Sequence, residues 1–175
     1  MSIANLTTAR LRLVPATKEM INAAFHRDLK TFAQWGFYPG DAWPDTDTLG
    51  IIPKVLQSLK AHNGPTGFET WLIIKTSDGA IIGDAGFKAP PRQDGVVDLG
   101  YSLIAAERGN GYATEAAAAL VQWAFCQPSV QAVSALCLIS NNASIRVLRK
   151  LGLTETRRDD KYIYWLLQRA DNPIP

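Results

Sequence analysis

Residues 108–114 read RGNGYAT, and this glycine-rich stretch separates an apolar run, residues 96–104, from an alanine-rich one, residues 113–125. Alanine favours helix, so the chain passes here from a strand to a helix. The first N–H groups of such a helix lack helical partners, and glycines without Cβ atoms let an anion approach them. The pattern therefore predicts a cradle for phosphate oxygens. A tight turn that only needs glycine explains the same residues, and the stretch alone leaves both interpretations open.

Two other phosphate-binding patterns do not fit this stretch. A P-loop requires G-x-x-x-x-G-K-[ST], and no lysine stands at the required place. A dinucleotide-binding fingerprint requires a third glycine and an acidic residue near the end of the next strand. Thr114 occupies the third position, and the next strand ends in LISNN. Both patterns are therefore excluded.

Hydrophobic patterning along the chain predicts an α/β domain with a mixed sheet, neither a barrel nor a doubly wound parallel fold. Asp78-Gly79 predicts a hairpin turn between two of the strands. The predicted strands are residues 9–14, 69–75, 80–87, 96–104, 132–139 and 161–167. The predicted helices are residues 18–25, 53–61 (with Pro53 in the first turn), 113–125 and 143–151.

Composition narrows the classes of partner. The 175 residues suit one domain, and the net charge of +2 gives no reason to expect nucleic-acid binding. No apolar run reaches the length of a membrane span, and the start, MSIANLTTARLRL, lacks a signal-peptide core. Cys126 and Cys137 lack metal-ligand spacing, so we expect buried free thiols and no metal. We expect a cytoplasmic protein without a membrane partner.

Residues 96–153 resemble the GNAT superfamily of N-acetyltransferases, and within it the Rim-type branch of ribosomal-protein N-terminal acetyltransferases. The family motif [QR]-x-x-G-x-[GA] is matched by residues 108–113. The branch pattern LGY then GYATEA is matched by residues 99–101 and 111–116, and N-x-x-S…L-G by Asn141, Ser144 and residues 151–152. The resemblance implies one N-acetyltransferase domain over residues 1–175, of the α/β (α+β) type, with a mixed, mostly antiparallel sheet flanked by helices.

The resemblance also implies acetyl-CoA as the donor, without a metal. Backbone amides of the glycine stretch would hold its pyrophosphate, and the Leu103 N–H would polarise the thioester carbonyl. Asn141 would bond the pantetheine arm, cap the following helix, or do both, and Arg108 would act through its backbone alone. The residues implied to bind the donor are Ser102, Leu103, Arg108, Gly109, Asn110, Gly111, Tyr112, Ala113, Thr114 and Asn141.

Two residues are candidates for proton transfer. An alkyl amine must lose a proton before it attacks the thioester. Asp98 stands where several family members carry a glutamate base, and an ordinary solvated carboxylate is the alternative. Many relatives have a tyrosine acid seven residues after the match to Asn141, which is Leu148 here, so Ser144 is the candidate acid, with a helix N-cap as its alternative. Glu69 and Asp84 are further carboxylates for which structural roles are favoured.

The resemblance implies direct transfer to a primary amine, either a protein N-terminus or a small molecule, in a ternary complex. A non-catalytic acyl-CoA-binding protein and a nucleotide-binding module are the alternatives. Four aromatic residues, Trp35, Phe37, Tyr38 and Trp43, either line the acceptor side or serve as core, and we favour core for two of them. Whether the protein is a monomer or a homodimer stays open.

Overall fold

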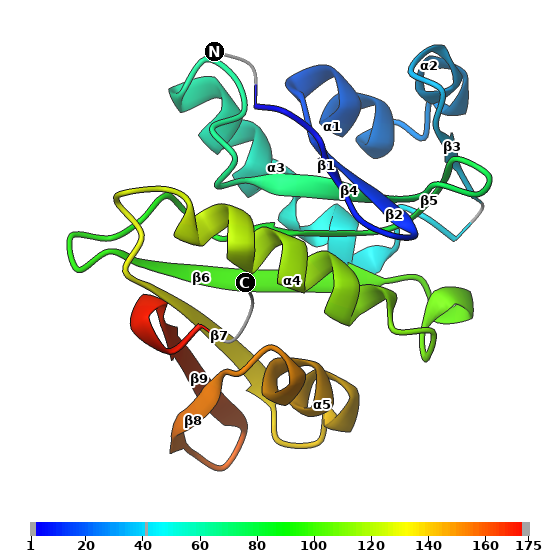
Figure 1. Ribbon diagram of the computed structural model, residues 1–175. Helices are drawn as coiled ribbons and strands as arrows, with labels where there is room; N and C mark the ends of the chain where they lie inside the picture. Colours follow the sequence, from blue (N-terminus) through cyan, green and yellow to red (C-terminus); the bar gives the residue numbers. More distant parts are fainter. Residues whose placement is uncertain (1–2, 41, 173–175) are drawn as a thin grey trace.

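The computed structural model describes residues 3–40 and 42–172 (Figure 1), and nine strands in this part of the chain form one sheet. The strand order is β1-β2-β4-β5-β6-β7-β9-β8, with β3 paired to β5 beside this path. Neighbours along the path are antiparallel except β6 and β7, which are parallel. The predicted mixed, mostly antiparallel sheet is therefore confirmed. The strands are β1 (Leu6–Thr7), β2 (Leu11–Pro15), β3 (Tyr38–Pro39), β4 (Thr70–Lys75), β5 (Ala80–Phe87), β6 (Val96–Leu103), β7 (Ala132–Leu138), β8 (Thr154–Arg158) and β9 (Tyr162–Gln168).

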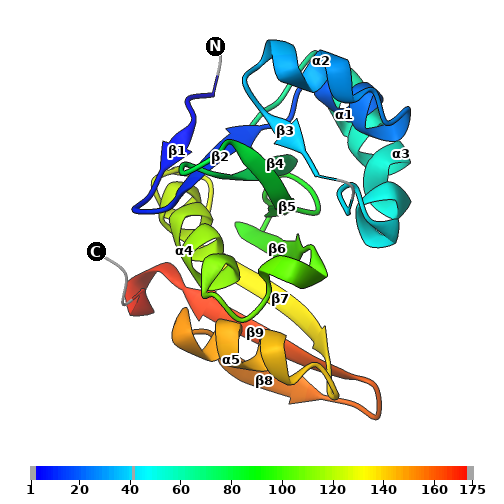
Figure 2. The same ribbon diagram turned by 90° about the vertical axis from the view of Figure 1, so that its right-hand side faces the viewer.

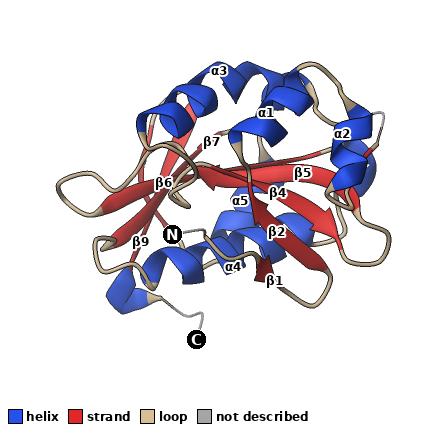
Figure 3. Cartoon of the chain, turned by 90° about the horizontal axis from the view of Figure 1, so that it is seen from above, coloured by secondary structure: helices blue, strands red, loops and turns tan. Residues whose placement is uncertain are grey.

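Helices cover both faces of the sheet (Figure 3). On one face lie α1 (Lys18–Phe25), α2 (Leu29–Gln34) and α3 (Thr46–Ala61), and on the other lie α4 (Tyr112–Phe125) and α5 (Asn142–Lys150). The apolar strand β4 buries Leu72 and Ile74 in the core beneath α1–α3, and Trp71 and Ile73 in the core beneath α4. Successive strand side chains point to opposite faces, so a continuous apolar run suits a sheet that is covered on both sides.

The parallel pair β6 and β7 separates part-way along its length. Residues 96–99 of β6 pair with residues 132–135 of β7, and beyond them the two strands diverge (Figure 2). β6 continues to Leu103, still paired with β5, and α4 follows it after a short loop. The divergence leaves one edge of the second half of β6 without a strand neighbour in the described part of the chain.

The predicted start of the second helix, near residue 53, is wrong. α3 begins at Thr46, because the side chain of Asp45 accepts the N–H of Thr48 and caps the helix there. Pro53 consequently lies inside α3, where the sequence alone had placed it in the first turn. Two longer elements, β8 and α2, and the two-residue strands β1 and β3 were also not predicted. β8 has five exposed polar residues and therefore no apolar alternation, and α2 has only six residues.

The burial of one candidate, Cys126, differs from the expectation. Cys137 is buried, but Cys126 is exposed, because α4 ends at Phe125 and Cys126 turns toward solvent at the helix end. Among the four aromatic residues, Phe37 and Trp43 are core residues, which confirms that two of the four are core. Trp35 packs partly buried against the same core, and Tyr38 is 57% exposed.

Two absences apply to the described residues, 3–40 and 42–172. None of their helices combines the length and apolarity needed to cross a membrane. They also contain no group of three or more His, Cys, Asp or Glu side chains arranged to hold a metal ion.

Candidate active site

The divergence of β6 and β7 leads into a cavity of about 460 Å³, which we call the glycine-loop cavity. Its walls come from the end of β6, the loop before α4, the first turn of α4 and one side of α5. The catalytic candidate Ser144 lines it. Nine of the ten residues predicted to bind the donor also line it: Ser102, Leu103, Arg108, Gly109, Gly111, Tyr112, Ala113, Thr114 and Asn141. Asn110 does not line the cavity, and its carbonyl accepts a hydrogen bond from Arg10 at 3.0 Å.

Among the five α-helices of residues 3–40 and 42–172, α4 alone begins without a side-chain hydrogen bond to its first turn. Gly111 occupies the N-cap position with φ of +82°, a left-handed conformation that costs glycine little. The first helical bond runs from the Glu115 N–H to the Gly111 carbonyl. The N–H groups of residues 112–114 therefore have no helical partner, and they lie at the wall of the cavity. The other four helices are capped by Thr17, Asp28, Asp45 and Asn141.

Contacts from the N-terminal strands hold this helix start in place. The carboxylate of Glu115 accepts hydrogen bonds from the Thr8 hydroxyl at 2.6 Å and from the Arg10 Nε at 2.8 Å. The Arg10 guanidinium also lies 4.5 Å from the centre of the Tyr112 ring. Burial alone would raise the pKa of Glu115, but the hydrogen bonds from Thr8 and Arg10 together lower it. Glu115 is therefore a fixed carboxylate that anchors the loop.

The end of β6 is held by two basic residues. The Arg108 Nε donates to the Leu103 carbonyl at 2.8 Å, so the Arg108 side chain fastens the strand end that lines the cavity. The Lys75 Nζ lies 2.7 Å from the carboxylate of Glu107 in the short 3₁₀ helix η1 (Ala105–Glu107). The side chain of Arg108 thus has a structural contact, in addition to the backbone role that the sequence suggested.

Asn141 and Ser144 have different roles in α5. The Asn141 Oδ1 accepts the Ser144 N–H at 3.0 Å, so Asn141 is the N-cap, and the alternative of Ser144 as N-cap is wrong. The Tyr101 hydroxyl donates to the Ser144 Oγ at 3.3 Å. Burial raises the pKa of Tyr101 to about 12, a larger effect than the lowering by its bond to Ser144. The phenol therefore stays protonated at neutral pH.

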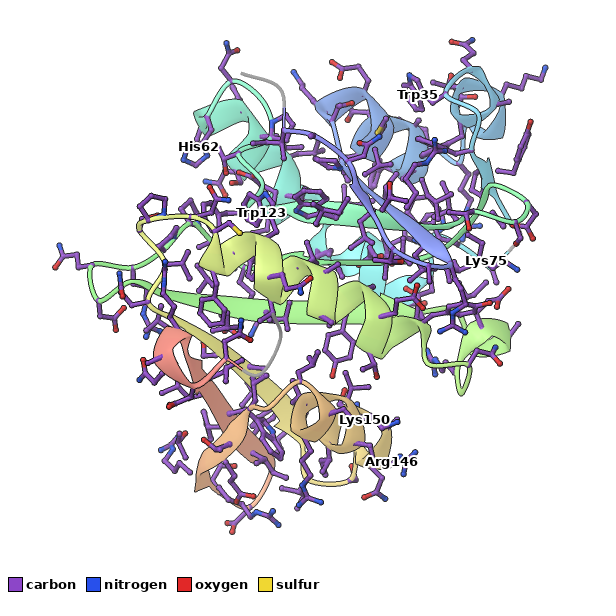
Figure 4. The ribbon with its side chains drawn as sticks, viewed as in Figure 1. Trp35, His62, Lys75, Trp123, Arg146 and Lys150 are labelled. Carbon is purple, nitrogen blue, oxygen red and sulfur yellow. The ribbon has the colours of Figure 1, made fainter. Side chains whose placement is uncertain are left out.

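Two basic residues that the sequence analysis did not single out line the same cavity. Arg146 and Lys150 lie on α5 (Figure 4), and with Arg108 they place three positive charges around the uncapped start of α4. Positive charge and free N–H groups together suit phosphate groups. The spacing of four residues puts Arg146 and Lys150 on one side of a helix. This spacing indicates a binding site only when α5 is known to face the cavity.

A second cavity, of about 470 Å³, lies between α3 and strands β4–β6, and we call it the α3 cavity. Tyr101 and Ser102 of β6 and Asp47 of α3 line both cavities, so the two cavities meet at the middle of β6. A molecule in one cavity can therefore react with a molecule in the other at this place.

Residues 10–154 match the family described as Acetyltransferase (GNAT) domain. The chain belongs to the GNAT acetyltransferase family. A relative named uncharacterized N-acetyltransferase YjdG, from Bacillus subtilis, is 31% identical over 161 residues, which cover 92% of this chain and 96% of that protein. The family match, this relative and the fold together show that the chain is an enzyme of the N-acetyltransferase class.

Solved structures of Rim-type acetyltransferases share the fold. RimL, titled ribosomal L7/L12 alpha-N-protein acetyltransferase in complex with coenzyme A, gives a TM-score of 0.68 at 18% identity, over 94% of this chain and 98% of its own. The ribosomal-protein-S5-alanine acetyltransferase from Vibrio fischeri gives 0.67 at 17% identity, over 97% and 98%. These neighbours show that the chain has the same fold as Rim-type acetyltransferases.

Carboxylates of this acetyltransferase line the α3 cavity. Asp84, which is 5% exposed, accepts hydrogen bonds at Oδ2 from the Thr48 hydroxyl at 2.6 Å and the Trp43 indole N–H at 3.4 Å. Burial raises the pKa of Asp84 to about 6, although both hydrogen bonds lower it. Glu69 accepts hydrogen bonds from the hydroxyls of Thr66 and Ser58, at 3.0 and 3.1 Å. Glu69 is therefore occupied by structural contacts.

Asp98, the predicted base, does not line either of the two cavities of the acetyltransferase. Its carboxylate forms an ion pair with Lys88, with 2.8 Å between Nζ and Oδ2. The other oxygen, Oδ1, is buried without a hydrogen bond among the described residues. Ser102, four residues further along β6, faces the junction instead. Asp98 lies at the position in β6 that the resemblance implied. Its side chain, paired with Lys88, is held away from the junction of the cavities.

Proposed function

We propose that this acetyltransferase transfers the acetyl group of acetyl-CoA to a primary amine, by direct attack in a ternary complex. The observation that carries the proposal is the junction of the two cavities at Tyr101 and Ser102. One cavity has an uncapped helix start and a basic rim, which suit the phosphates of the donor. The other has carboxylates, which suit the positive charge of an amine.

The residues around the glycine-loop cavity fit acetyl-CoA. In our proposal the backbone N–H groups of residues 109–114, Asn110 included, hold the pyrophosphate, and Arg108 holds the end of β6. The arm runs along Ser102 and Leu103, where the Leu103 N–H polarises the thioester carbonyl. Asn141 forms a hydrogen bond to the pantetheine arm through a donor or acceptor that its cap bond does not use. Two solved neighbours support the choice of donor, since RimL is titled as a complex with coenzyme A and the acetyltransferase MccE as a complex with acetyl-CoA and AMP.

Direct attack agrees with the positions of the two cysteines. Cys137 is buried, and the Trp165 indole N–H donates to its sulfur at 3.2 Å. Cys126 lies at the far end of α4 from the glycine loop, and neither cysteine lines the two cavities. An acetyl-cysteine intermediate therefore has no place in the proposal. Free cysteines also agree with a reducing compartment, and we place the enzyme in the cytoplasm.

The experiment is calorimetric titration with acetyl-CoA, CoA and ATP, followed by an assay of amine-dependent thiol release. We expect saturable binding of both CoA compounds, weak or no binding of ATP, and thiol release that requires an amine. Binding of ATP without binding of CoA would favour a nucleotide-binding module. Tight binding of acetyl-CoA without thiol release for any amine or peptide would favour a non-catalytic acyl-CoA-binding protein.

A further inference from the structure

The floor of the α3 cavity brings one carboxylate next to the junction with the donor cavity. Asp84 of β5 and Ser102 of β6 are directly opposite each other in the antiparallel ladder. Side chains in such a pair lie on the same face, with Cβ atoms about 5 Å apart. Both residues line the α3 cavity, and Ser102 also lines the glycine-loop cavity. Asp84 is therefore the nearest cross-strand neighbour of a residue at the junction.

The carboxylate of Asp84 is fixed but not fully occupied. Thr48 of α3 and Trp43 both donate to its Oδ2, and these two bonds hold the orientation of the carboxylate. No hydrogen bond reaches Oδ1 from residues 3–40 and 42–172, and Asp84 lines the cavity. Oδ1 is thus the oxygen left to accept a hydrogen bond from a molecule in the cavity.

The walls above Asp84 are largely apolar. Ile51 and Val55 of α3, together with Phe68 and Phe87, line the cavity. Gly100, next to Ser102 on the same face of β6, leaves the floor open, because a Cβ there would meet no heavy atom within 4 Å. A volume of about 470 Å³ lies within the usual range of small-molecule sites. The space suits an apolar body with one polar end.

We infer that Asp84 binds the ammonium group of the acceptor and takes its proton, and that the acceptor is a small primary amine with an apolar body. The inference rests on the proposed acetyl transfer and names its acceptor side. Asp84 would be a catalytic residue, since its Oδ1 would contact the reacting nitrogen. It would take the role that the sequence suggested for Asp98, which lines neither cavity and is paired with Lys88.

The acceptor enters as its ammonium form and loses two protons during acetyl transfer. The ammonium gives one proton to Oδ1 of Asp84, and the nitrogen lone pair forms a bond to the thioester carbonyl carbon. The C–S bond then breaks, and its electron pair leaves with the sulfur. The second nitrogen proton is lost as the amide forms, and this proton reaches the departing thiolate through the hydroxyls at Ser144 and Tyr101. The products are an N-acetyl amide and CoA thiol, and Asp84 returns its proton to solvent.

Several charged groups act on Asp84 and on the amine. Asp47 and Glu69 also line the cavity, and Asp45 and Asp47 act with burial to raise the pKa of Asp84. Two lysines, Lys54 and Lys88, are exposed at the cavity and Lys88 is paired with Asp98, while the Tyr101 phenol stays neutral. Buried carboxylates on the floor favour a cation and disfavour an acceptor that carries its own carboxylate.

A pair of substrates and a pair of variants test the inference. 2-Phenylethylamine and phenylalanine differ by one carboxylate, and we expect kcat/KM to be at least about tenfold higher for the amine. Asp84→Asn should lower kcat with 2-phenylethylamine by about a hundredfold or more, since the base is lost. Activity of the parent should be level above a pH of about 6 and fall below it, whereas Asp84→Asn, which must use the scarce free amine, should decline steadily with falling pH and show no break near 6. Asp98→Asn is the comparison, and it should keep the low-pH loss.

Binding measurements give a readout besides turnover. Gly100→Val places a side chain in the α3 cavity without backbone strain, since valine suits a strand. Calorimetry should show at least about tenfold weaker binding of 2-phenylethylamine to Gly100→Val, and unchanged binding of acetyl-CoA. If binding of 2-phenylethylamine is unchanged, the α3 cavity is not the acceptor site.

The outcomes separate the inference from the proposed function. If the parent acetylates 2-phenylethylamine while Asp84→Asn keeps full turnover, or while Asp98→Asn loses the low-pH dependence, the assignment of Asp84 is wrong. A preference of the parent for spermidine or an alanine-initiated peptide would contradict the inferred class of acceptor. It would leave the proposed acetyl transfer intact. A parent without thiol release for any of these acceptors contradicts the proposed function, and the inference falls with it.

Discussion

At the scale of single residues, Ser144 and Tyr101 form a pair of hydroxyls at the wall of the glycine-loop cavity. The Tyr101 hydroxyl donates to the Ser144 Oγ, which leaves the Ser144 proton free to point elsewhere. Leu148, one helical turn further along α5, is buried and has no proton to give. In the proposed reaction, this pair would supply the proton for the departing thiolate that the leucine cannot give.

Ser144→Ala separates a chemical role from a structural one. The cap bond of α5 uses the backbone N–H of Ser144, so the variant keeps it. We expect the free energy of unfolding to fall by less than about 1 kcal/mol, the size of one lost hydrogen bond. Turnover should fall about a hundredfold if the hydroxyl protonates the thiolate. Denaturant unfolding and thiol release measure the two quantities.

Asn141→Ala is the structural comparison, because it removes the cap itself and should cost roughly 1 kcal/mol of stability. Unchanged turnover per folded molecule of Ser144→Ala would show that the thiolate leaves without this acid.

Asp84 should lower stability where it is charged. Its pKa in the folded protein, about 6, lies above the ordinary value of 3.8, so the folded state binds the proton more tightly. The stabilising effect of this proton is complete below pH about 4 and is lost as the pH rises through about 6. At pH 8, Asp84→Asn should be more stable than the parent by up to about 3 kcal/mol, and the difference should vanish near pH 4.

Denaturant unfolding of both proteins at the two pH values measures this difference. If the stability difference between variant and parent were the same at both pH values, ionisation of Asp84 would not cost the folded state stability.

At the scale of elements, the uncapped start of α4 is the feature on which donor binding depends in our proposal. Gly109 has φ of +82°, and a Cβ there would meet no heavy atom within 4 Å. Asparagine tolerates this conformation better than other side chains, so Gly109→Asn adds bulk beside the first-turn N–H groups with little backbone strain. Valine at Gly111 would add strain to bulk, because φ there is also +82°.

Gly109→Asn should weaken binding of acetyl-CoA by about tenfold or more, which is about 1.4 kcal/mol. Gly36→Asn is the matched control, because Gly36 has φ of +72° and equally open surroundings and does not line either cavity. Calorimetry measures affinity, and thermal unfolding measures stability. Equal acetyl-CoA affinity of the two variants and the parent would contradict the phosphate assignment.

The elements that local patterns determine were predicted well. The alanine-rich run gave α4, the apolar runs gave β4–β7 and β9, and the glycines gave the loop. The start of α3 was missed because a capping aspartate, Asp45, outweighs the proline in the helix. β8 was missed because its residues are polar on both faces. Such elements depend on their neighbours, which no local pattern shows.

Most of the residues that the resemblance implied for the donor line one cavity, and all but Asn141 lie within residues 102–114. The contacts that complete it are not local. Arg10 and Glu115 are 105 residues apart, and Asp84 meets Thr48 across 36 residues. Asp98 and Asp84 are both strand carboxylates in the sequence, and only the sheet register places Asp84 opposite Ser102.

At the scale of the whole molecule, the site exists because helices pack on both faces of one sheet. α4 and α5 on one face bound the glycine-loop cavity, and α3 on the other face covers the α3 cavity. β6 lies between them and contributes to both. Donor and acceptor can therefore approach the same strand from two directions, which is what direct transfer between two bound molecules requires.

The measurement that tests this account most directly is a single-turnover experiment with the full chain in excess over acetyl-CoA, in the presence and absence of 2-phenylethylamine. Mass spectrometry follows the acetylated amine and the protein, and a thiol reagent follows CoA. The account predicts equal amounts of N-acetyl amide and CoA thiol, formed at the same rate, with no acetylated protein and no thiol release without the amine. Thiol release without the amine, or an acetylated protein that forms before the amide, would contradict it.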